Sequence, residues 1–282
     1  MKNNFINIYF DLKLNIHYYI LKMSNSVITV NSLDINQIII TEPKINKNNK
    51  QLSSAILYKK TSSGIYIETP TLMNPFGVSS YDGGKAWSIA LNNKIMDEDK
   101  ADDIHKLFSF FKELDEMAID FVIKHSQAIF KKKYDETQRS IVTDLLYQRC
   151  VKSPVKDGNV YPDIFNCKIN KIDEANPLPD LLIYKESNIP LNINSWDDVV
   201  EAIPRGLPVK AIIQPRIYFI NGKAGINFRL LQILVPKNQK PGRPIEFGFT
   251  ETFETKETSI PGIETIEAHD SEDDEVANVE FA

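Results

Sequence analysis

The sequence predicts an α+β fold that is mainly β with inserted helices. Three segments indicate it: short β-branched runs between residues 27 and 58, an amphipathic helical pattern over residues 101–130, and two strand patterns that flank Asn221-Gly222. Of the 282 residues, 42% are hydrophobic and 25% charged, which is typical of a globular protein. A chain of this length can form a hydrophobic core of its own.

The first part of the expected body consists of β-type material. The runs VITV, IIIT and AILY between residues 27 and 58 are separated by polar turns rich in Asn and Lys. Residues 63–91 have the pattern of a strand, a loop with Pro and Gly, and a second strand. Asp82-Gly83-Gly84 is the turn signal before the strand of residues 87–91.

A helical insert is predicted over residues 99–150. Its first helix covers residues 101–130, where apolar side chains recur at helical spacing. These positions are Ile104, Leu107, Phe108, Phe111, Leu114, Ala118, Phe121, Val122 and Ile129. Acidic residues precede this helix and the basic residues 131–133 follow it, as the helix dipole favours. A second helix is expected from residue 135 to about residue 150.

β-type segments return after the insert. Strands are predicted over residues 163–169 and 181–184, followed by a short helix over residues 196–203. Ser195 is the expected N-cap of this helix, because acidic residues follow it in the first turn.

The best-defined element is a hairpin formed by residues 209–220 and 226–235. Asn221-Gly222 is a preferred pair for a type I′ turn, in which both central residues need a positive φ. A two-residue loop predicts that Ile217 faces Ile226, that Arg216 faces Asn227, and that Gln214 faces Arg229.

Alternation along the hairpin sorts its side chains onto two faces. One face is apolar and is expected in the core: Ile213, Ile217, Phe219, Ile226, Phe228 and Leu230. The other face is polar and basic, with one aromatic: Lys210, Gln214, Arg216, Tyr218, Asn227 and Arg229. Such a face suits nucleic acid, because Lys and Arg contact phosphates and Tyr218 offers a stacking surface. A solvated sheet face with no ligand is the alternative.

A second group of aromatic and basic residues occurs earlier in the chain. Its members are Tyr58, Lys59, Lys60, Tyr66, Phe76, Tyr81, Lys85 and Trp87. Trp87 shares a strand face with Ile89 and Leu91, which favours a core position, whereas Phe76 lies in a loop between Pro75 and Gly77. The candidate nucleic-acid contacts from this group are Lys59, Lys60, Tyr66, Phe76 and Lys85.

No catalytic role is predicted. The chain contains no GxxxxGK[ST], GxGxxG, GxSxG or HExxH motif. Its four histidines are scattered without metal-ligand spacing, and Cys150 and Cys167 form no CxxC motif. We therefore expect no cofactor, no metal site and no enzyme activity. Two unreactive, unpaired cysteines are typical of a protein in a reducing compartment.

Both ends of the chain differ from the expected domain of residues 27–250. Residues 1–26 are treated as an N-terminal extension in which Met23 is an alternative start, and Asp11, Lys13 and His17 interrupt every apolar run. No signal peptide or membrane-spanning segment is therefore expected. Residues 251–282 carry eleven acidic side chains and one basic, a net charge of −10, while the other 250 residues carry +5. Such a tail is typically disordered, and a solubility tail is one interpretation of it.

Three segments give the chain a resemblance to a known family. They are MNPFGVSSYDGGKAWSIAL at residues 73–91, IYFINGKAGINFRLLQI at residues 217–233, and the acidic tail that closes on VEFA. With them the chain resembles the single-stranded DNA-binding proteins of the short-tailed coliphage type, and related proteins suspected in nucleocytoplasmic large DNA viruses.

The resemblance implies an OB-fold-like barrel that binds single-stranded DNA in a basic, aromatic groove. It also implies a tail that occupies the groove when DNA is absent and recruits replication proteins. On this chain the tail residues would be Glu272, Asp273, Asp274, Glu275, Glu280 and the terminal aromatic Phe281. Ala282 follows Phe281, whereas the family pattern ends on the aromatic itself.

The leading hypothesis is a sequence-independent single-stranded DNA-binding protein that acts in viral replication, recombination or repair. It would work inside the cell, in the host cytoplasm or at a viral replication site, with packaging in the virion as a further option. Homodimerisation is one role open to the long helix. The alternatives are a virion structural or assembly protein with a chaperone-like tail, and an enzyme with an unfamiliar site.

Overall fold

The structure is a computed structural model, and it describes residues 27–45, 52–59, 63–81, 83–84, 86–172, 178–185 and 189–236. The predicted extension of residues 1–26 and the acidic tail of residues 251–282 lie outside these described residues, as do Lys60 and Lys85.

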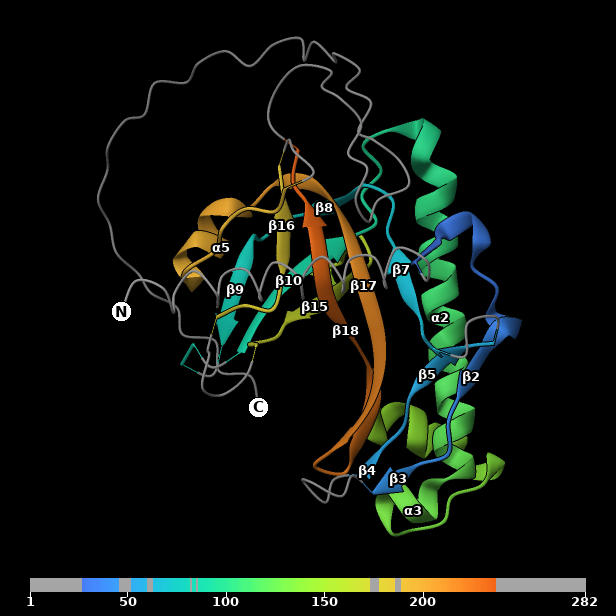
Figure 1. The fold of residues 1–282 in the computed structure, drawn as a ribbon. Coiled ribbons are helices and arrows are strands. Elements are labelled where there is room, and N and C mark those ends of the chain that lie inside the picture. Colours follow the sequence, from blue (N-terminus) through green and yellow to red (C-terminus); the bar gives the residue numbers. More distant parts are fainter. Residues whose placement is uncertain are drawn as a thin grey trace, which may run out of the picture.

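The described chain is mainly β with one long helix, which confirms the predicted fold class (Figure 1). The strands are β1 Val27–Thr29, β2 Ile38–Ile40, β3 Lys44–Ile45, β4 Leu52–Ser53, β5 Ile56–Tyr58, β6 Ser63–Gly64, β7 Tyr66–Glu68, β8 Leu72–Asn74, β9 Val78–Tyr81, β10 Ala86–Asn92, β11 Tyr147–Gln148, β12 Val151–Lys152, β13 Val155–Lys156, β14 Asn159–Val160, β15 Ile164–Ile169, β16 Leu182–Tyr184, β17 Leu207–Ile220 and β18 Lys223–Leu234. The helices are α2 Ala101–Lys124, α3 Ser126–Phe130, α4 Arg139–Ile141 and α5 Trp196–Ala202, with 3₁₀ turns at η1 Val30–Ser32, η2 Ile35–Gln37, η3 Glu98–Lys100 and η4 Glu136–Gln138, and a π turn at η5 Val142–Leu146.

Five strands close into a ring. β17 pairs with β8, β8 with β10, β10 with β15, β15 with β18, and β18 returns to β17. The β15–β18 pairing is parallel and the other four are antiparallel. A single residue pair, Asn92 with Met73, joins β8 to β10, so the ring is nearly open at that seam. The fold is thus an OB-fold-like barrel, a five-stranded architecture that is often partly open.

The hairpin of β17 and β18 is the largest element of the barrel and bends along its whole length (Figure 1). Asn221 and Gly222 have φ values of 51° and 70°, as a type I′ turn requires. The predicted pairs of Ile217 with Ile226, Arg216 with Asn227 and Gln214 with Arg229 are all present. A bulge between Ile212 and Ile213 then shifts the register.

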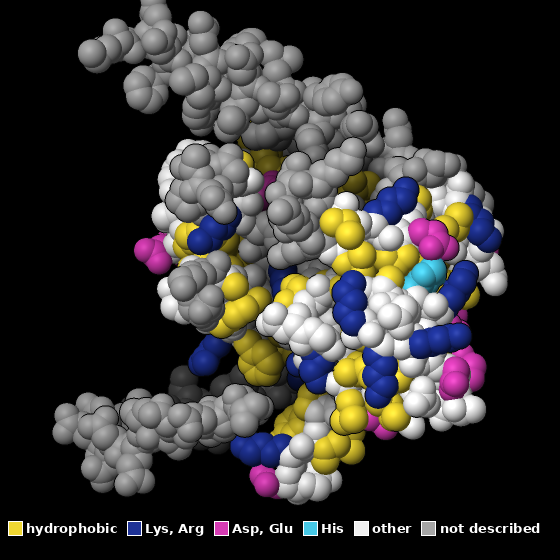
Figure 2. Space-filling model, turned by 90° about the horizontal axis from the view of Figure 1, so that it is seen from below, with side chains coloured by type: hydrophobic (Ala, Val, Ile, Leu, Met, Phe, Trp, Pro, Cys, Tyr) yellow, Lys and Arg dark blue, Asp and Glu magenta, His cyan; other side chains and the backbone are white. Residues whose placement is uncertain are grey.

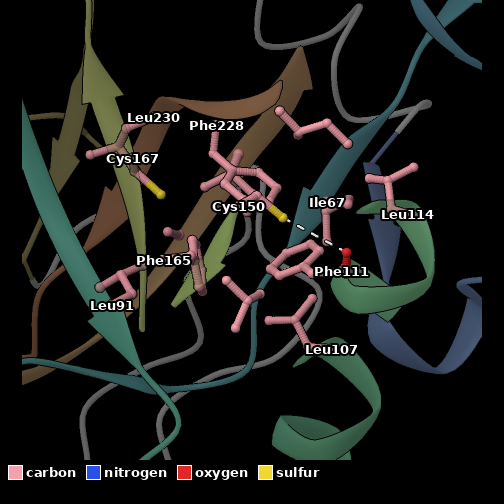
Figure 3. Close-up of a cluster of buried hydrophobic side chains, with 14 of the residues drawn as sticks. Ile67, Leu91, Leu107, Phe111, Leu114, Cys150, Phe165, Cys167, Phe228 and Leu230 are labelled. Atoms are coloured by element: carbon pink, nitrogen blue, oxygen red, sulfur yellow. Dashed lines mark hydrogen bonds between the residues drawn. The ribbon is translucent and has the colours of Figure 1, made fainter. Parts of the chain in front are cut away.

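Aromatic side chains from α2 and the barrel form the centre of the core (Figure 3). The ring of Phe111, on α2, lies 5.0 Å from that of Phe165 on β15 and 4.5 Å from that of Phe228 on β18. All three side chains are buried. The helix therefore closes one side of the barrel with its apolar face, which explains why an amphipathic helix is inserted between β strands.

The helical insert differs from the prediction at its C-terminal part. The first helix is interrupted at His125, and Lys131, with a φ of 61°, ends the short α3. The second predicted helix, from residue 135 to about 150, is wrong beyond Leu146, because Tyr147 and Gln148 form β11 and pair in parallel with Ala224 and Gly225. Sheet pairing and burial of Tyr147 thus override the local helical pattern.

The short helix α5 agrees with the prediction at its N-terminus. Ser195 is the N-cap, and it forms a capping box with Asp198. Trp196, the first residue of α5, stacks on Trp87 of β10 with ring centroids 4.6 Å apart and planes 7° apart. The predicted inward position of Trp87 thus corresponds to this stack, in which Trp87 is half-buried.

Within the described residues, none of the helices combines the length and apolar character needed to cross a bilayer.

Replacing Phe111 with Ala should lower the free energy of unfolding by about 3–5 kcal/mol, because the change empties a fully enclosed aromatic site. Urea denaturation followed by circular dichroism measures the effect. Phe76→Ala is the matched control, since that side chain is 64% exposed and its removal should change stability by no more than about 0.5 kcal/mol. Equal midpoints for the two variants would contradict the packing described.

Candidate functional site

A groove of about 580 Å³ lies on the outer surface of the barrel. It is lined by Tyr81, Ser88, Gln148, Arg149, Cys150, Lys152, Asn166, Lys168, Tyr218, Ile226 and Asn227. These residues come from β9, β10, β11, β12, β15, β17 and β18 or, for Arg149 and Cys150, from the turn between β11 and β12. We call this lined cavity the barrel groove.

Strand register places a polar row across the barrel, which runs from two residues of the groove to two residues that lie beside it. Ser88 of β10 is opposite Lys168 of β15, and Lys168 is opposite Arg229 of β18. Arg229 is in turn opposite Gln214 of β17. On β15 the neighbouring positions Cys167 and Ile169 are buried, so alternation directs the polar row outward.

Tyr218 is held against the sheet at one side of the groove. Its cross-strand partner is Gly225, and its hydroxyl donates a hydrogen bond of 2.7 Å to Oε1 of Gln148. A Cβ atom at position 225 would lie 2.7 Å from the Tyr218 hydroxyl oxygen, so only Gly leaves room for this arrangement. Burial, and then the nearby Asp115 carboxylate, raises the pKa of Tyr218, which keeps the phenol a neutral donor.

A buried carboxylate fixes the strands that carry Gln148, Arg149 and Lys152. Asp115 of α2 accepts a hydrogen bond of 2.7 Å from the Tyr147 hydroxyl and one of 3.0 Å from the backbone N–H of Cys150. Desolvation raises the pKa of Asp115, since its side chain is almost fully buried. The long helix thus supports the groove from behind as well as packing the core.

The cations of this surface differ in how they are compensated. Arg149 forms a 2.7 Å ion pair with Glu116, and Arg229 is paired with Asp180. Lys152 and Lys168 are exposed, and no described carboxylate forms an ion pair with either of them. These two lysines are therefore the groove cations best able to meet an incoming anion.

Several predicted residues meet on this face. Tyr218 and Asn227 line the barrel groove, and Gln214, Arg216 and Arg229 lie beside it on the same strands. Arg216 also donates a 3.0 Å hydrogen bond from Nε to Oε1 of Gln214.

The predicted exposed position of Lys210 is wrong. Only 4% of the Lys210 surface is exposed, and its Nζ lies 3.4 Å from Oε1 of Glu68, which is also buried. Lys210 lies on the same face of β17 as Ile212, but this end of the face is covered: Glu68 of β7 is opposite Ile212, and Ile212 packs with Tyr184 and Leu234. Lys210 therefore does not belong to the groove.

The second predicted group does not gather into one site. Lys59 donates from Nζ to the Asn36 carbonyl oxygen at 2.6 Å, and Tyr66 packs against a small cluster of Tyr184, Ile212 and Leu234. Phe76 is exposed, but it is not among the residues that line the groove. From the wider aromatic group, Tyr81 does line it, with 44% of its surface exposed.

Sequence reasoning missed the contribution of β15 and of the chain after α2. Asn166 and Lys168 alternate with buried Phe165, Cys167 and Ile169, and this period-two pattern was a usable signal. Gln148 and Arg149 carried no such signal, because they fell in the second predicted helix, and Lys152 lay outside every predicted element.

The groove offers cations, carboxamides and aromatic rings, and no clustered metal ligands. Among the described residues, no group of three or more His, Cys, Asp or Glu side chains could hold a metal ion. Figure 2 shows Lys and Arg side chains distributed widely over one face of the molecule, with fewer Asp and Glu side chains among them.

Replacing Gly225 with Ala should displace Tyr218 or separate β11 from β18, because the new Cβ would also lie 2.7 Å from the Gln148 carbonyl oxygen. We expect stability to fall by about 1–3 kcal/mol from this overpacking, measured by urea denaturation. Asn227→Ala, two residues away on the same strand and face, is the control. A Gly225→Ala variant as stable as the control would contradict this placement of Tyr218.

Comparison with known proteins gives low similarities only. No protein-family model matches the chain, and no curated protein matches it. Among solved structures, the single-stranded DNA-binding protein of bacteriophage Enc34, in a form with a C-terminal truncation, is 17% identical; the match covers 73% of this chain and 98% of that one, with a TM-score of 0.35. The same phage protein in complex with single-stranded DNA is 18% identical over 73% of this chain and 98% of that one, also with a TM-score of 0.35. Gp2.5, a single-stranded DNA-binding protein of bacteriophage T7, is 12% identical over 62% of this chain and 93% of that one, with a TM-score of 0.35.

Proposed function

We propose that this chain is a sequence-independent single-stranded DNA-binding protein, without catalytic activity, that supports viral DNA replication, recombination or repair inside the cell. The observation that carries the proposal is the barrel groove, in which exposed Lys152 and Lys168 lie with the aromatic side chains of Tyr81 and Tyr218. Single-strand binders combine these two elements, a positive groove for the phosphates and aromatic faces for the bases.

The position of the groove supports the same function. OB-folds bind oligonucleotides on the face of their second and third strands, and β10 and β15 are the second and third strands of this barrel in chain order. Aromatic rings stack on any base, and lysine contacts to phosphate carry no sequence information. The groove therefore favours binding without sequence preference.

The acidic tail enters the proposal as a competitor for the groove. Its net charge of −10 is opposite in sign to that of the other 250 residues, at +5. We propose that Glu272, Asp273, Asp274, Glu275 and Glu280 compete with DNA phosphates, and that Phe281 helps to recruit replication proteins.

The double variant Lys152→Ala/Lys168→Ala should bind oligo-dT more weakly and with a shallower salt dependence. For a single strand, the slope of log K against log salt should become shallower by about 0.7 for every phosphate that the protein no longer neutralises. Fluorescence anisotropy at several salt concentrations measures this slope. Lys124→Ala, an exposed lysine on α2, is the matched control. An unchanged slope in the double variant would exclude these lysines from the interface.

Deletion of residues 251–282 should tighten binding to oligo-dT, most strongly at low salt, because about ten competing negative charges are removed. Filter binding of the full-length and truncated proteins to single- and double-stranded DNA measures the change. A truncated protein with no affinity for oligo-dT at low salt would contradict the proposed function, and a large stable oligomer would then favour a virion assembly role.

A further inference from the structure

The hairpin of β13 and β14 stands away from the body of the protein. Every residue from position 152 to position 162 is exposed. Val155 pairs with Val160, and Lys156 pairs with Asn159. Asp157 and Gly158 form the turn, with φ values of 52° and 78°, which suit a type I′ turn.

Hydrogen bonds hold the base of this hairpin in place, whereas no other described strand pairs with β13 or β14. Asp163 accepts hydrogen bonds from the Ser153 hydroxyl and, at 2.7 Å, from Nζ of Lys112 on α2. The backbone N–H of Tyr161 donates to the Pro154 carbonyl oxygen at 2.9 Å. The hairpin therefore projects from a fixed base, unlike an unstructured loop.

The hairpin begins at the barrel groove. Lys152, the last residue of β12, lines the groove, and β12 pairs with β15, which contributes Asn166 and Lys168 to it. Beyond Lys152 the hairpin offers a second lysine, Lys156, and an exposed aromatic, Tyr161, which is 47% exposed. The hairpin thus carries the same kinds of side chain, basic and aromatic, that line the groove.

The hairpin also exposes an apolar pair to solvent. Val155 and Val160 are 65% and 78% exposed and lie directly opposite each other. Isolated two-stranded hairpins are only marginally stable in water, so a bound partner would stabilise this one. By alternation the other face of the hairpin carries Lys156 and Tyr161, and with Lys152 at its base these side chains suit a chain that has negative charges and flat apolar groups. Asp157 adds one negative charge at the turn.

We infer that the β13–β14 hairpin is an arm that lies against a bound single strand of nucleic acid and extends the interface beyond the barrel groove. Lys152 and Lys156 contact phosphates, and Tyr161, on the same face of the arm as Lys156, stacks on a base that leaves the groove. This inference rests on the proposed function, because it requires the strand to occupy the groove first.

Shortening the arm tests the inference. Residues 155–160 are replaced by Asn-Gly, a two-residue turn that joins Pro154 to Tyr161 where their backbones already pair. Affinities are measured for oligo-dT of about 4 to about 16 nucleotides, the range that a single OB-fold occupies. The full-length protein should gain affinity with length until both groove and arm are filled, and the shortened variant should stop gaining at a smaller length.

Point variants keep the test independent of folding of the shortened chain. Tyr161→Ala should weaken binding of the longest oligonucleotide about tenfold, the scale of one base stack, and leave the shortest one bound as before. Tyr161→Phe should retain the affinity for the longest oligonucleotide.

The outcomes separate the arm from the groove. If the arm variants bind every length like the parent protein while Lys168→Ala weakens binding, the inference fails and the proposed function stands. If the parent protein binds no length, both fail. If shortening the arm abolishes self-association in sedimentation and leaves DNA binding intact, the valine pair is a contact between copies of the chain, and the inference is overturned.

Discussion

The pairing of β17 with β18 is the constraint on which the rest of the molecule depends. These two strands close the barrel ring, because β17 reaches β8 on one side and β18 reaches β15 on the other. Their register is set by the turn at Asn221-Gly222. A slip of one residue would turn Phe228 outward and Asn227 inward, and so would exchange the core for the groove.

The long helix α2 contacts both the core of the barrel and the strands beside the groove. Phe111 of α2 meets Phe165 and Phe228 inside the barrel. One turn further along the same helix, Asp115 receives hydrogen bonds from Tyr147 and from the backbone at Cys150. A single element therefore joins the apolar interior to the strands that carry Gln148, Arg149 and Lys152. This double attachment explains why a helix is inserted at this point in a β fold.

The sequence allowed prediction of the elements whose signals are local. The type I′ turn, the register around it, the α2 pattern and the Ser195 cap each depend on residues close in the chain, and all agree with the structure. Tyr218 and Asn227 were found on the groove face for the same reason. The burial of Lys210 was not predictable in this way, because it results from segments distant in the sequence: β7, which carries Glu68, and the cluster of Tyr184, Ile212 and Leu234.

The remainder of the groove depends on contacts between segments far apart in the chain. Tyr147 and Gln148 become a strand only because β18 offers a free edge, while their own residues fit a helix. Gly225 leaves room for the Tyr218 side chain, and Gln148 accepts the hydrogen bond from its hydroxyl. Tyr218 and Gln148 are 70 residues apart in the sequence. Local periodicity carries no information about such contacts between distant segments.

The ion pairs of Arg149 and Arg229 have a consequence for how the surface exchanges ligands. Glu116 and Asp180 serve as counter-ions supplied by the protein itself. In the proposed complex, a phosphate that reaches either guanidinium meets a charge that a carboxylate of the protein already neutralises, so fewer of the strand's condensed cations are released there. The two arginines would then contribute orientation more than affinity, and a strand could move along the surface by exchanging one anion for another.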